Sequence, residues 1–181
     1  LYFSRLAESK SSILHKLDLA REKYLLMTLH RAANTDSLRA LQNIFQALEQ
    51  LSEYTVVFPL HPRTKQAIEG FGLKYPKKVR FIDPVGYLDM LALEKNAAKI
   101  LTDSGGVQKE AYLFQVPCIT MREETEWIET VQAGWNILVG SDTEKIVQAV
   151  KHFNPSSAWI PYYGQGDSAK HIVNVLLSFA R

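Results

Sequence analysis

The sequence has a single cysteine, no long apolar run and almost no net charge. One cysteine, Cys118, excludes an internal disulfide, and its apolar neighbours favour a buried structural thiol over a nucleophile. No apolar run approaches the roughly 20 residues that a membrane-spanning helix needs, and the first residues show no signal-peptide pattern. These absences argue against a membrane protein and favour a reducing, cytoplasmic setting.

The charge balance gives no general attraction to polyanions. Lys and Arg total 21, and Asp and Glu total 19, which leaves a net charge of +2. So small a value favours neither nucleic acid nor a membrane surface as a partner, and any phosphate site has to be local. Hydrophobic residues make up 46% of the 181 residues, so we expect residues 1–181 to form a single domain around one core.

Several motifs of common enzyme classes are also missing. No His-x-x-His, Cys-x-x-Cys or Asp-x-Asp spacing occurs, so we expect no metal site. No Gly-x-Gly-x-x-Gly follows the first expected strand, which argues against a dinucleotide, and we expect no cofactor. Ser104 lacks the Gly-x-Ser-x-Gly surroundings of a nucleophilic serine.

Short apolar runs alternate with helical patterns along the chain. The runs predict strands at 24–29, 55–60, 79–82, 100–102, 118–121 and 136–139. The periodicity predicts surface helical turns within 1–19 and helices at about 38–51, 62–70, 88–95, from 105 onward, 125–133, 143–151 and 168–179. We therefore expect an α/β fold, with a Rossmann-like, doubly wound parallel sheet of about six strands and helices on both faces.

Residues 99–116 predict a buried strand, a tight turn and a helix that opens from the turn. Gly105 and Gly106 carry no Cβ, so a ligand can approach the backbone there, where N–H groups at a helix start attract phosphate. Ser104 adds a hydroxyl that can bind a ligand or cap the helix. Glu110 lies about one to one and a half turns further on, where its carboxylate could accept hydrogen bonds from sugar hydroxyls. The alternative is a tight strand-to-helix turn that binds nothing.

Polar side chains collect where the expected strands end. In an open parallel sheet, ligands bind beyond the carboxyl ends of the strands, so the group favours a binding site there. Each residue taken alone could be an ordinary loop residue, and for His61 we favour that interpretation. The group consists of His30, Arg31, His61, Asp103, Ser104, Arg122 and Glu123.

Three blocks carry a family resemblance. Residues 28–34, 102–111 and 122–126 read Thr-Leu-His-Arg-Ala-Ala-Asn, Thr-Asp-Ser-Gly-Gly-Val-Gln-Lys-Glu-Ala and Arg-Glu-Glu-Thr-Glu. Their order and spacing resemble the non-hydrolysing UDP-N-acetylglucosamine 2-epimerases, but only the second half of such an enzyme. Those enzymes are similar to GT-B glycosyltransferases, in which two Rossmann-like domains face each other across a cleft and the C-terminal one holds UDP.

The resemblance implies a reaction and its partners. UDP-GlcNAc and UDP-ManNAc would be interconverted by removal of the C2 proton, departure of UDP and re-addition of UDP from a glucal. It implies a UDP-sugar substrate, an N-terminal domain missing from this chain, a homo-oligomeric full-length enzyme and a role in cell-surface polysaccharide biosynthesis. The carboxylates that handle the C2 proton would lie in the missing domain, so we expect this chain alone to be inactive.

The resemblance also implies roles for individual residues. His30, Ser104, Gly105 and Gly106 would contact the diphosphate, and His30 would stabilise it as a leaving group, which is the one catalytic role expected here. Glu110 would bind the ribose hydroxyls, and the turn at 84–87 the uracil. The expected substrate-binding residues are His30, Arg31, Val85, Tyr87, Ser104, Gly105, Gly106, Glu110 and Arg122.

Two positions depart from the family pattern. Ala33 stands where the family usually has Glu, and Trp127-Ile128 stands where many members have Arg-Pro. The second variant resembles relatives that act on UDP-2,3-diacetamido-glucuronate, so an epimerase for that sugar is an alternative. A GT-B glycosyltransferase domain and a UDP-binding module without activity are the others.

Overall fold

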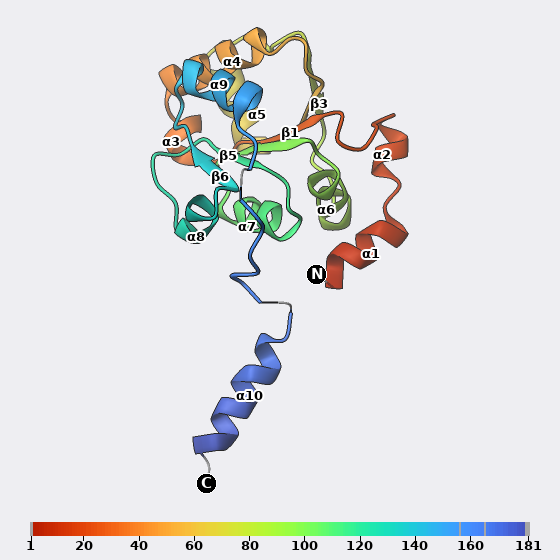
Figure 1. Ribbon diagram of the computed structural model, residues 1–181. Coiled ribbons are helices and arrows are strands. Elements are labelled where there is room, and N and C mark those ends of the chain that lie inside the picture. Colours follow the sequence, from red (N-terminus) through yellow and green to blue (C-terminus); the bar gives the residue numbers. More distant parts are fainter. Residues whose placement is uncertain (1, 156, 165, 180–181) are drawn as a thin grey trace.

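The sheet of the computed structural model, which describes residues 2–155, 157–164 and 166–179, has six parallel strands in the order β3-β2-β1-β4-β5-β6 (Figure 1). All six expected strands are confirmed to within one residue at either end. The strands are β1 (Leu25–Thr28), β2 (Val56–Pro59), β3 (Val79–Ile82), β4 (Lys99–Thr102), β5 (Cys118–Thr120) and β6 (Asn136–Leu138). The predicted Rossmann-like fold class is therefore confirmed.

The strand order reverses between β1 and β4, which pair directly although two strands separate them in sequence. Their register aligns Thr28 with Thr102, whose hydroxyl oxygens lie 2.6 Å apart. The chain segments that leave β1 and β4 therefore start side by side at the same edge of the sheet. In open α/β sheets this reversal is where ligands bind.

Helices cover both faces of the sheet, and each face has its own apolar core (Figure 1). One core is covered by α4, α5 and α9, and the other by α1, α2, α6 and α7. The helices are α1 (Tyr2–Lys10), α2 (Ile13–Lys16), α3 (Ala32–Thr35), α4 (Leu38–Gln50), α5 (Pro62–Gly70), α6 (Tyr87–Lys95), α7 (Gly105–Leu113), α8 (Ile128–Gln132), α9 (Thr143–His152) and α10 (Ser168–Phe179).

Local sequence accounts for most of these helices. The apolar residues of α4 recur at helical spacing and are buried, and the hydroxyl of Ser37 accepts from the N–H of Ala40 at its start. Helix α5 begins at Pro62, which suits a first helical turn, and His61 caps it by accepting from the N–H of Arg63. In α6, by contrast, the consecutive residues 91–94 are all buried, and the last of them is a glutamate.

The expected helix over 125–133 is shorter than predicted. It begins only at Ile128, because the hydroxyl of Thr125 accepts from the N–H of Trp127 and donates to Gln108, which holds the preceding turn out of helical geometry. Its predicted end is confirmed, since Gly134 follows with a φ of +71°. The expected helical turns in 1–19 are α1 and α2, and Leu1 lies outside the described residues.

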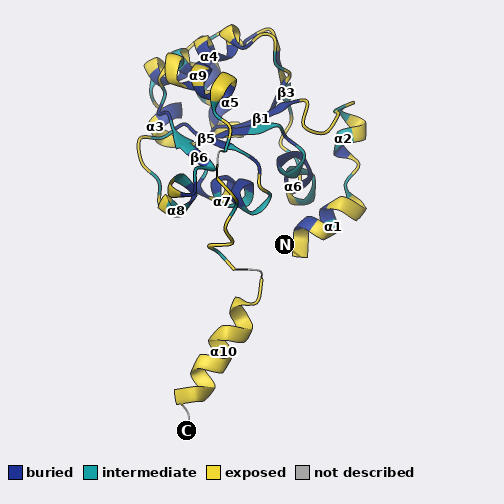
Figure 2. Cartoon of the chain, viewed as in Figure 1, coloured by how far each residue is buried: buried dark blue, intermediate teal, exposed yellow. Residues whose placement is uncertain are grey.

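Helix α10 is present as predicted, but none of its residues is buried (Figure 2). It follows the irregular stretch after α9 and extends away from the sheet. Its exposed apolar side chains are Ile172, Val173, Val175, Leu176, Leu177 and Phe179. The single domain over 1–181 therefore stays a prediction, since only the part before α10 is organised around the sheet.

Two smaller expectations concern Cys118 and the membrane. Cys118 is buried in β5, as expected of a structural thiol, and burial raises the pKa of its thiol to about 12. Within the described residues, no helix combines the length and the apolar character needed to cross a membrane.

Candidate functional site

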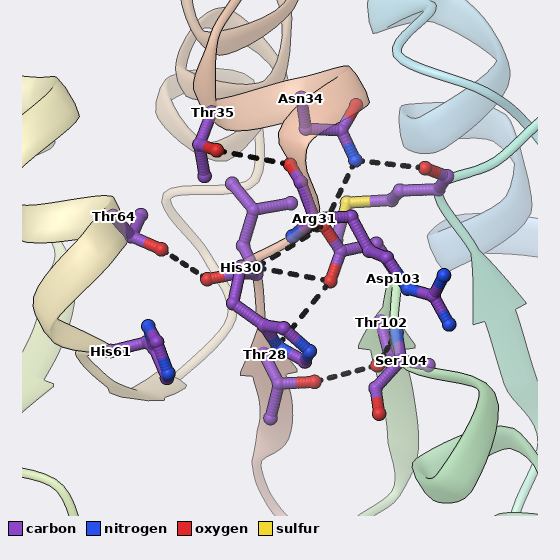
Figure 3. Close-up of polar contacts among 12 residues, drawn as sticks. Thr28, His30, Arg31, Asn34, Thr35, His61, Thr64, Thr102, Asp103 and Ser104 are labelled. Carbon is purple, nitrogen blue, oxygen red and sulfur yellow. Dashed lines mark hydrogen bonds and ion pairs between the residues drawn. The ribbon is translucent and has the colours of Figure 1, made fainter.

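The Asp103 carboxylate joins the two chain segments at the strand-order reversal (Figure 3). Asp103 follows β4 and is 0% exposed. It accepts hydrogen bonds from the backbone N–H groups of His30 (3.0 Å) and Arg31 (2.8 Å) and from the side-chain amide of Asn34 (3.1 Å). The sequence placed Asp103 at the site without giving it a role. The structure shows that it fixes the loop after β1 against the start of α7.

The same loop is also held from two other sides. The side-chain amide of Asn34 donates to the carbonyl of Met121, at the end of β5. The hydroxyl of Thr64, on α5, donates to the carbonyl of Leu29 (Figure 3). The backbone at residues 29–34 is therefore fixed by the elements on both sides of it.

His30 projects from this fixed loop. Its Nδ1 lies 3.7 Å from an Asp103 oxygen, and its ring centroid is 5.2 Å from that of His61. Burial lowers the pKa of His30, the Asp103 carboxylate opposes this, and the neighbouring His61, Arg31 and Arg63 lower the pKa further. Because an ordinary histidine has a pKa of about 6.5, His30 is neutral at pH 7 and can donate one hydrogen bond.

The predicted phosphate turn has the expected backbone. Helix α7 begins at Gly105, directly after Ser104, so the first N–H groups of the helix point beyond the carboxyl end of β4. The expectation that Ser104 could cap this helix is wrong, because its side chain accepts no cap hydrogen bond and its own N–H donates to the hydroxyl of Thr102. The serine hydroxyl is thus left for another partner.

The two glycines of the turn have different surroundings. A Cβ built on Gly106 would meet only the hydroxyl of Ser104, at 3.8 Å, so there is room over this residue. A Cβ built on Gly105 would overlap the carboxylate of Glu126. A carboxylate therefore lies against the N-terminus of α7, where the helix dipole favours negative charge.

Two arginines hold the Glu126 carboxylate in this place. Arg122 donates to one of its oxygens at 2.8 Å, and a guanidinium nitrogen of Arg31 lies 3.7 Å from the other. A hydrogen bond from its own backbone N–H, together with Arg122 and Arg31, lowers the pKa of Glu126. The sequence named Glu126 only as part of the 122–126 block and did not place it at this helix start, although its position four residues after Arg122 in a polar loop was a usable signal.

Glu110 and Tyr87, to which the sequence assigned separate roles, are in contact. The hydroxyl of Tyr87, at the start of α6, donates to a carboxylate oxygen of Glu110 on α7 at 3.1 Å. Tyr87 is 55% exposed, so this pair lies at the surface of the molecule. It leaves the remaining acceptor positions of the Glu110 carboxylate for a ligand.

Val85 lines a small apolar cavity of about 210 Å³ beside the histidines. Its lining residues are Thr28, Leu29, His30, Pro59, His61, Pro84, Val85, Met90 and Val107. Val107 belongs to the first turn of α7, so the cavity borders the turn that carries Ser104 and the glycines. A planar, mostly apolar group attached to a phosphate could enter it.

The structure thus brings the predicted residues together in two adjoining groups. His30, Arg31, Ser104, Gly105 and Arg122 surround the start of α7, and Tyr87 and Glu110 meet further along the same helix. No group of three or more His, Cys, Asp or Glu side chains that could hold a metal ion occurs among the described residues. The chemistry that this arrangement offers is anion binding, with sugar binding beside it.

Comparison with known proteins gives a consistent result. A family model described as UDP-N-acetylglucosamine 2-epimerase matches residues 1–177. A Methanococcus maripaludis protein described as a UDP-N-acetylglucosamine 2-epimerase homolog is 50% identical over 178 residues, which are 95% of this chain and 50% of that protein. The UDP-2,3-diacetamido-2,3-dideoxy-D-glucuronate 2-epimerase of Pseudomonas aeruginosa is 46% identical, over 83% of this chain and 41% of that one.

A solved structure agrees with these relatives. It is the UDP-GlcNAc 2-epimerase of Methanocaldococcus jannaschii in complex with UDP-GlcNAc and UDP, which matches with a TM-score of 0.86 and 42% identity. The match covers 98% of this chain and 51% of that one. This chain therefore spans about half the length of the relatives it matches.

We predict that Asp103→Ala lowers the free energy of unfolding by about 2 to 4 kcal/mol, because it leaves several buried donors without an acceptor. Urea denaturation measures the loss. Asp36→Ala is the matched control, since that carboxylate is exposed and pairs with exposed Arg63, so it should change stability little. Equal losses in the two variants would show that Asp103 does not have this role.

Proposed function

Because this chain belongs to the UDP-N-acetylglucosamine 2-epimerase family, we propose that it is the UDP-binding half of an enzyme that interconverts UDP-GlcNAc and UDP-ManNAc. The observation that carries the proposal is the meeting of Ser104, the α7 N-terminus, Arg31 and Arg122 at the strand-order reversal. These groups together suit a diphosphate, because they supply backbone donors, a hydroxyl and two cations.

The diphosphate would bind over Gly106, where there is room beside the Ser104 hydroxyl. The Glu126 carboxylate lies at the same helix end and pairs with the same arginines. The bound diphosphate would therefore compete with Glu126 for Arg31 and Arg122. Once released, the two guanidinium groups would neutralise the charge that develops on UDP as it leaves the sugar.

His30 would act on the same leaving group. Because its imidazole is neutral in the free protein, it would first stabilise the diphosphate by donating one hydrogen bond. Negative charge nearby raises the pKa of a histidine, so the bound diphosphate would favour the protonated form. His30 would then carry a positive charge when UDP departs.

The nucleoside would lie along α7. Glu110 would accept hydrogen bonds from the two ribose hydroxyls, with its carboxylate held by Tyr87. The uracil would enter the cavity lined by Val85. The phosphate turn, Val107 of the cavity and Glu110 all belong to α7.

The chemical step would need the rest of the enzyme. A base removes the C2 proton, the C1–O bond breaks, and its electron pair leaves with UDP to give a 2-acetamidoglucal; protonation from the other face and re-addition of UDP complete the epimerisation. We assign neither acid nor base to this chain and place both in the other half. The full-length protein would be a cytoplasmic homo-oligomer that serves cell-surface polysaccharide synthesis.

The second candidate function is epimerisation of UDP-2,3-diacetamido-glucuronate. Trp127-Ile128 favours it, and the Pseudomonas aeruginosa enzyme of that description is 46% identical, which is about as similar as the UDP-N-acetylglucosamine 2-epimerases are. Trp127 lies close to the phosphate turn, because its indole nitrogen is 3.5 Å from a Cβ built on Gly105. A residue that departs from the family pattern therefore lies beside the proposed diphosphate site.

The proposal is tested with the purified 181-residue chain. We expect it to bind UDP in calorimetry, because the whole UDP site lies within it, but to give no deuterium at C2 of UDP-GlcNAc in heavy water. Absence of UDP binding would contradict the proposal. Exchange by the chain alone would place a base within it. Glucal formation by the full-length protein separates an epimerase from a glycosyltransferase or an inactive module.

We predict that Glu110→Ala weakens UDP binding by about 1.5 to 3 kcal/mol, because ribose hydroxyls lose a charged acceptor. Binding of 2′-deoxy-UDP should weaken less, since one of the two hydroxyls is already missing. Glu144→Ala, which removes a carboxylate from α9, is the control and should leave both affinities unchanged. The same loss for both nucleotides would argue against a ribose contact.

We predict that Glu126→Gln strengthens UDP binding about two- to fivefold, which corresponds to the 0.3 to 1 kcal/mol of one charge at a helix N-terminus. The amide keeps the shape but no longer competes as an anion for Arg31 and Arg122. Uridine, which has no phosphate, should bind as before. Weaker UDP binding by the variant would mean that Glu126 instead positions Arg122 for the ligand.

A further inference from the structure

Glu94, on α6, has an unusual position for a carboxyl group. It is 0% exposed, and neither of its oxygens receives a hydrogen bond from a donor among the described residues. Its neighbours on the helix, Leu91, Ala92 and Leu93, belong to the apolar core between α6 and the sheet. An ionised carboxylate is strongly disfavoured in such a place, so the group is expected to hold its proton.

Helices α6 and α7 pack against each other, and the carboxyl groups of Glu94 and Glu110 interact electrostatically across this contact. Burial raises the pKa of Glu94 well above its usual range, and the Glu110 carboxylate raises it further. Burial also raises the pKa of Glu110, but hydrogen bonds from Tyr87 and Glu94 counteract this. The proton of the pair is therefore on Glu94 and the negative charge on Glu110.

Among the described side chains around the pair, none supplies a compensating cation. Tyr24, whose hydroxyl donates to the carbonyl of Leu93, and Cys118 on β5 are neutral neighbours of Glu94. Lys109, beside Glu110 in sequence, lies instead over the Trp127 ring. Lys95, beside Glu94, pairs with Glu8 of α1. No ion pair between described residues includes Glu94 or Glu110.

We propose that Glu94 is a positioning residue of the ribose site, and that it acts as a buried carboxylic acid which donates a hydrogen bond to the Glu110 carboxylate. The inference rests on the proposed function, in which Glu110 binds the ribose. An ionised carboxylate has about four acceptor positions. Glu94 and Tyr87 take two of them and fix the group, and two remain for the 2′- and 3′-hydroxyls.

This arrangement predicts how stability depends on pH. The pKa of Glu94 is higher in the folded than in the unfolded protein, so the folded state binds more protons. The contribution of Glu94 to stability is therefore complete below its ordinary pKa of about 4.5 and is lost as pH rises through its raised pKa. The affinity for UDP should fall over the same pH range, because Glu94 and Glu110 then become two neighbouring negative charges.

Two variants test the inference. Glu94→Gln keeps a donor that cannot ionise, and Glu94→Met keeps the volume but cannot donate. We expect Glu94→Met to weaken UDP binding about two- to tenfold, the range for one hydrogen bond. Glu94→Gln should restore the affinity at pH 7 and should remove the part of its decline with rising pH that comes from ionisation of Glu94. Neither change should alter binding of 2′,3′-dideoxy-UDP, which has no hydroxyls for Glu110.

A double variant separates positioning from packing. In a Glu110→Ala background, Glu94→Met should cause no further loss of UDP affinity, because its effect passes through Glu110. The inference would be overturned if Glu94→Met bound UDP as tightly as wild type does. It would also be overturned if the losses of affinity in the double variant were additive, or if Glu94→Met weakened binding of UDP and of its dideoxy form equally. If Glu94→Met does not fold, the pH profile of UDP affinity in Glu94→Gln decides alone, and a decline identical to that of wild type over the whole pH range would overturn the inference.

Measurements of stability separate a failure of the proposed function from a failure of this inference. If the wild-type chain binds no UDP, the free energy of unfolding still reports on the pair. In urea denaturation, wild type should lose stability as pH rises above about 4.5, and Glu94→Gln should lose clearly less. Identical slopes for the two proteins would show that Glu94 holds no proton, whatever the ligand is.

Discussion

The geometry of the site depends on one buried carboxylate. Asp103 leaves β4 at the reversal of strand order and accepts from the backbone of the loop that leaves β1. Without this acceptor, the N–H groups of His30 and Arg31 would lack their partner, and the loop would be held only by the contacts of Asn34 and Thr64. The positions of the His30 ring and the Arg31 guanidinium, and so the proposed diphosphate site, follow from a contact between segments more than 70 residues apart in sequence.

The positive charges of two arginines at this edge of the sheet are already balanced in the free protein. Glu126 lies at the N-terminus of α7 and pairs with Arg122 and Arg31, which would otherwise be two cations facing a helix dipole. The lowered pKa of His30 keeps this positive charge from increasing, because the imidazole beside those arginines carries no charge at pH 7. A diphosphate would therefore exchange partners with groups that are in place already, and its net gain would be smaller than the full attraction of two arginines suggests.

The sequence predicted the strands, the turn at Ser104 and the helices of the core, because apolar periodicity and capping residues act over a few neighbours. It could not predict the overlap of Glu126 with Gly105 or the contact of Tyr87 with Glu110, because each joins two elements whose distance only the packed fold sets. Burial of Glu94 was hidden for the same reason, since a glutamate near the end of a helix ordinarily faces water. Even where periodicity was right, as for α10, it did not show that the helix lies away from the core.

Three glutamates of this region show that surroundings, more than residue type, decide what a carboxyl group can do. Glu126 is exposed to water and held by arginines, so it carries a full charge and can be exchanged for another anion. Glu94 is buried away from water and has no cation beside it among the described residues, so its carboxyl group keeps its proton and can serve only as a hydrogen-bond donor. Glu110 lies between these extremes, with burial on one side and a tyrosine hydroxyl at the surface on the other. A carboxylate that is held on one side and open on the other is well suited to select the two adjacent hydroxyls of a ribose, because a freely rotating one would lose entropy on binding them.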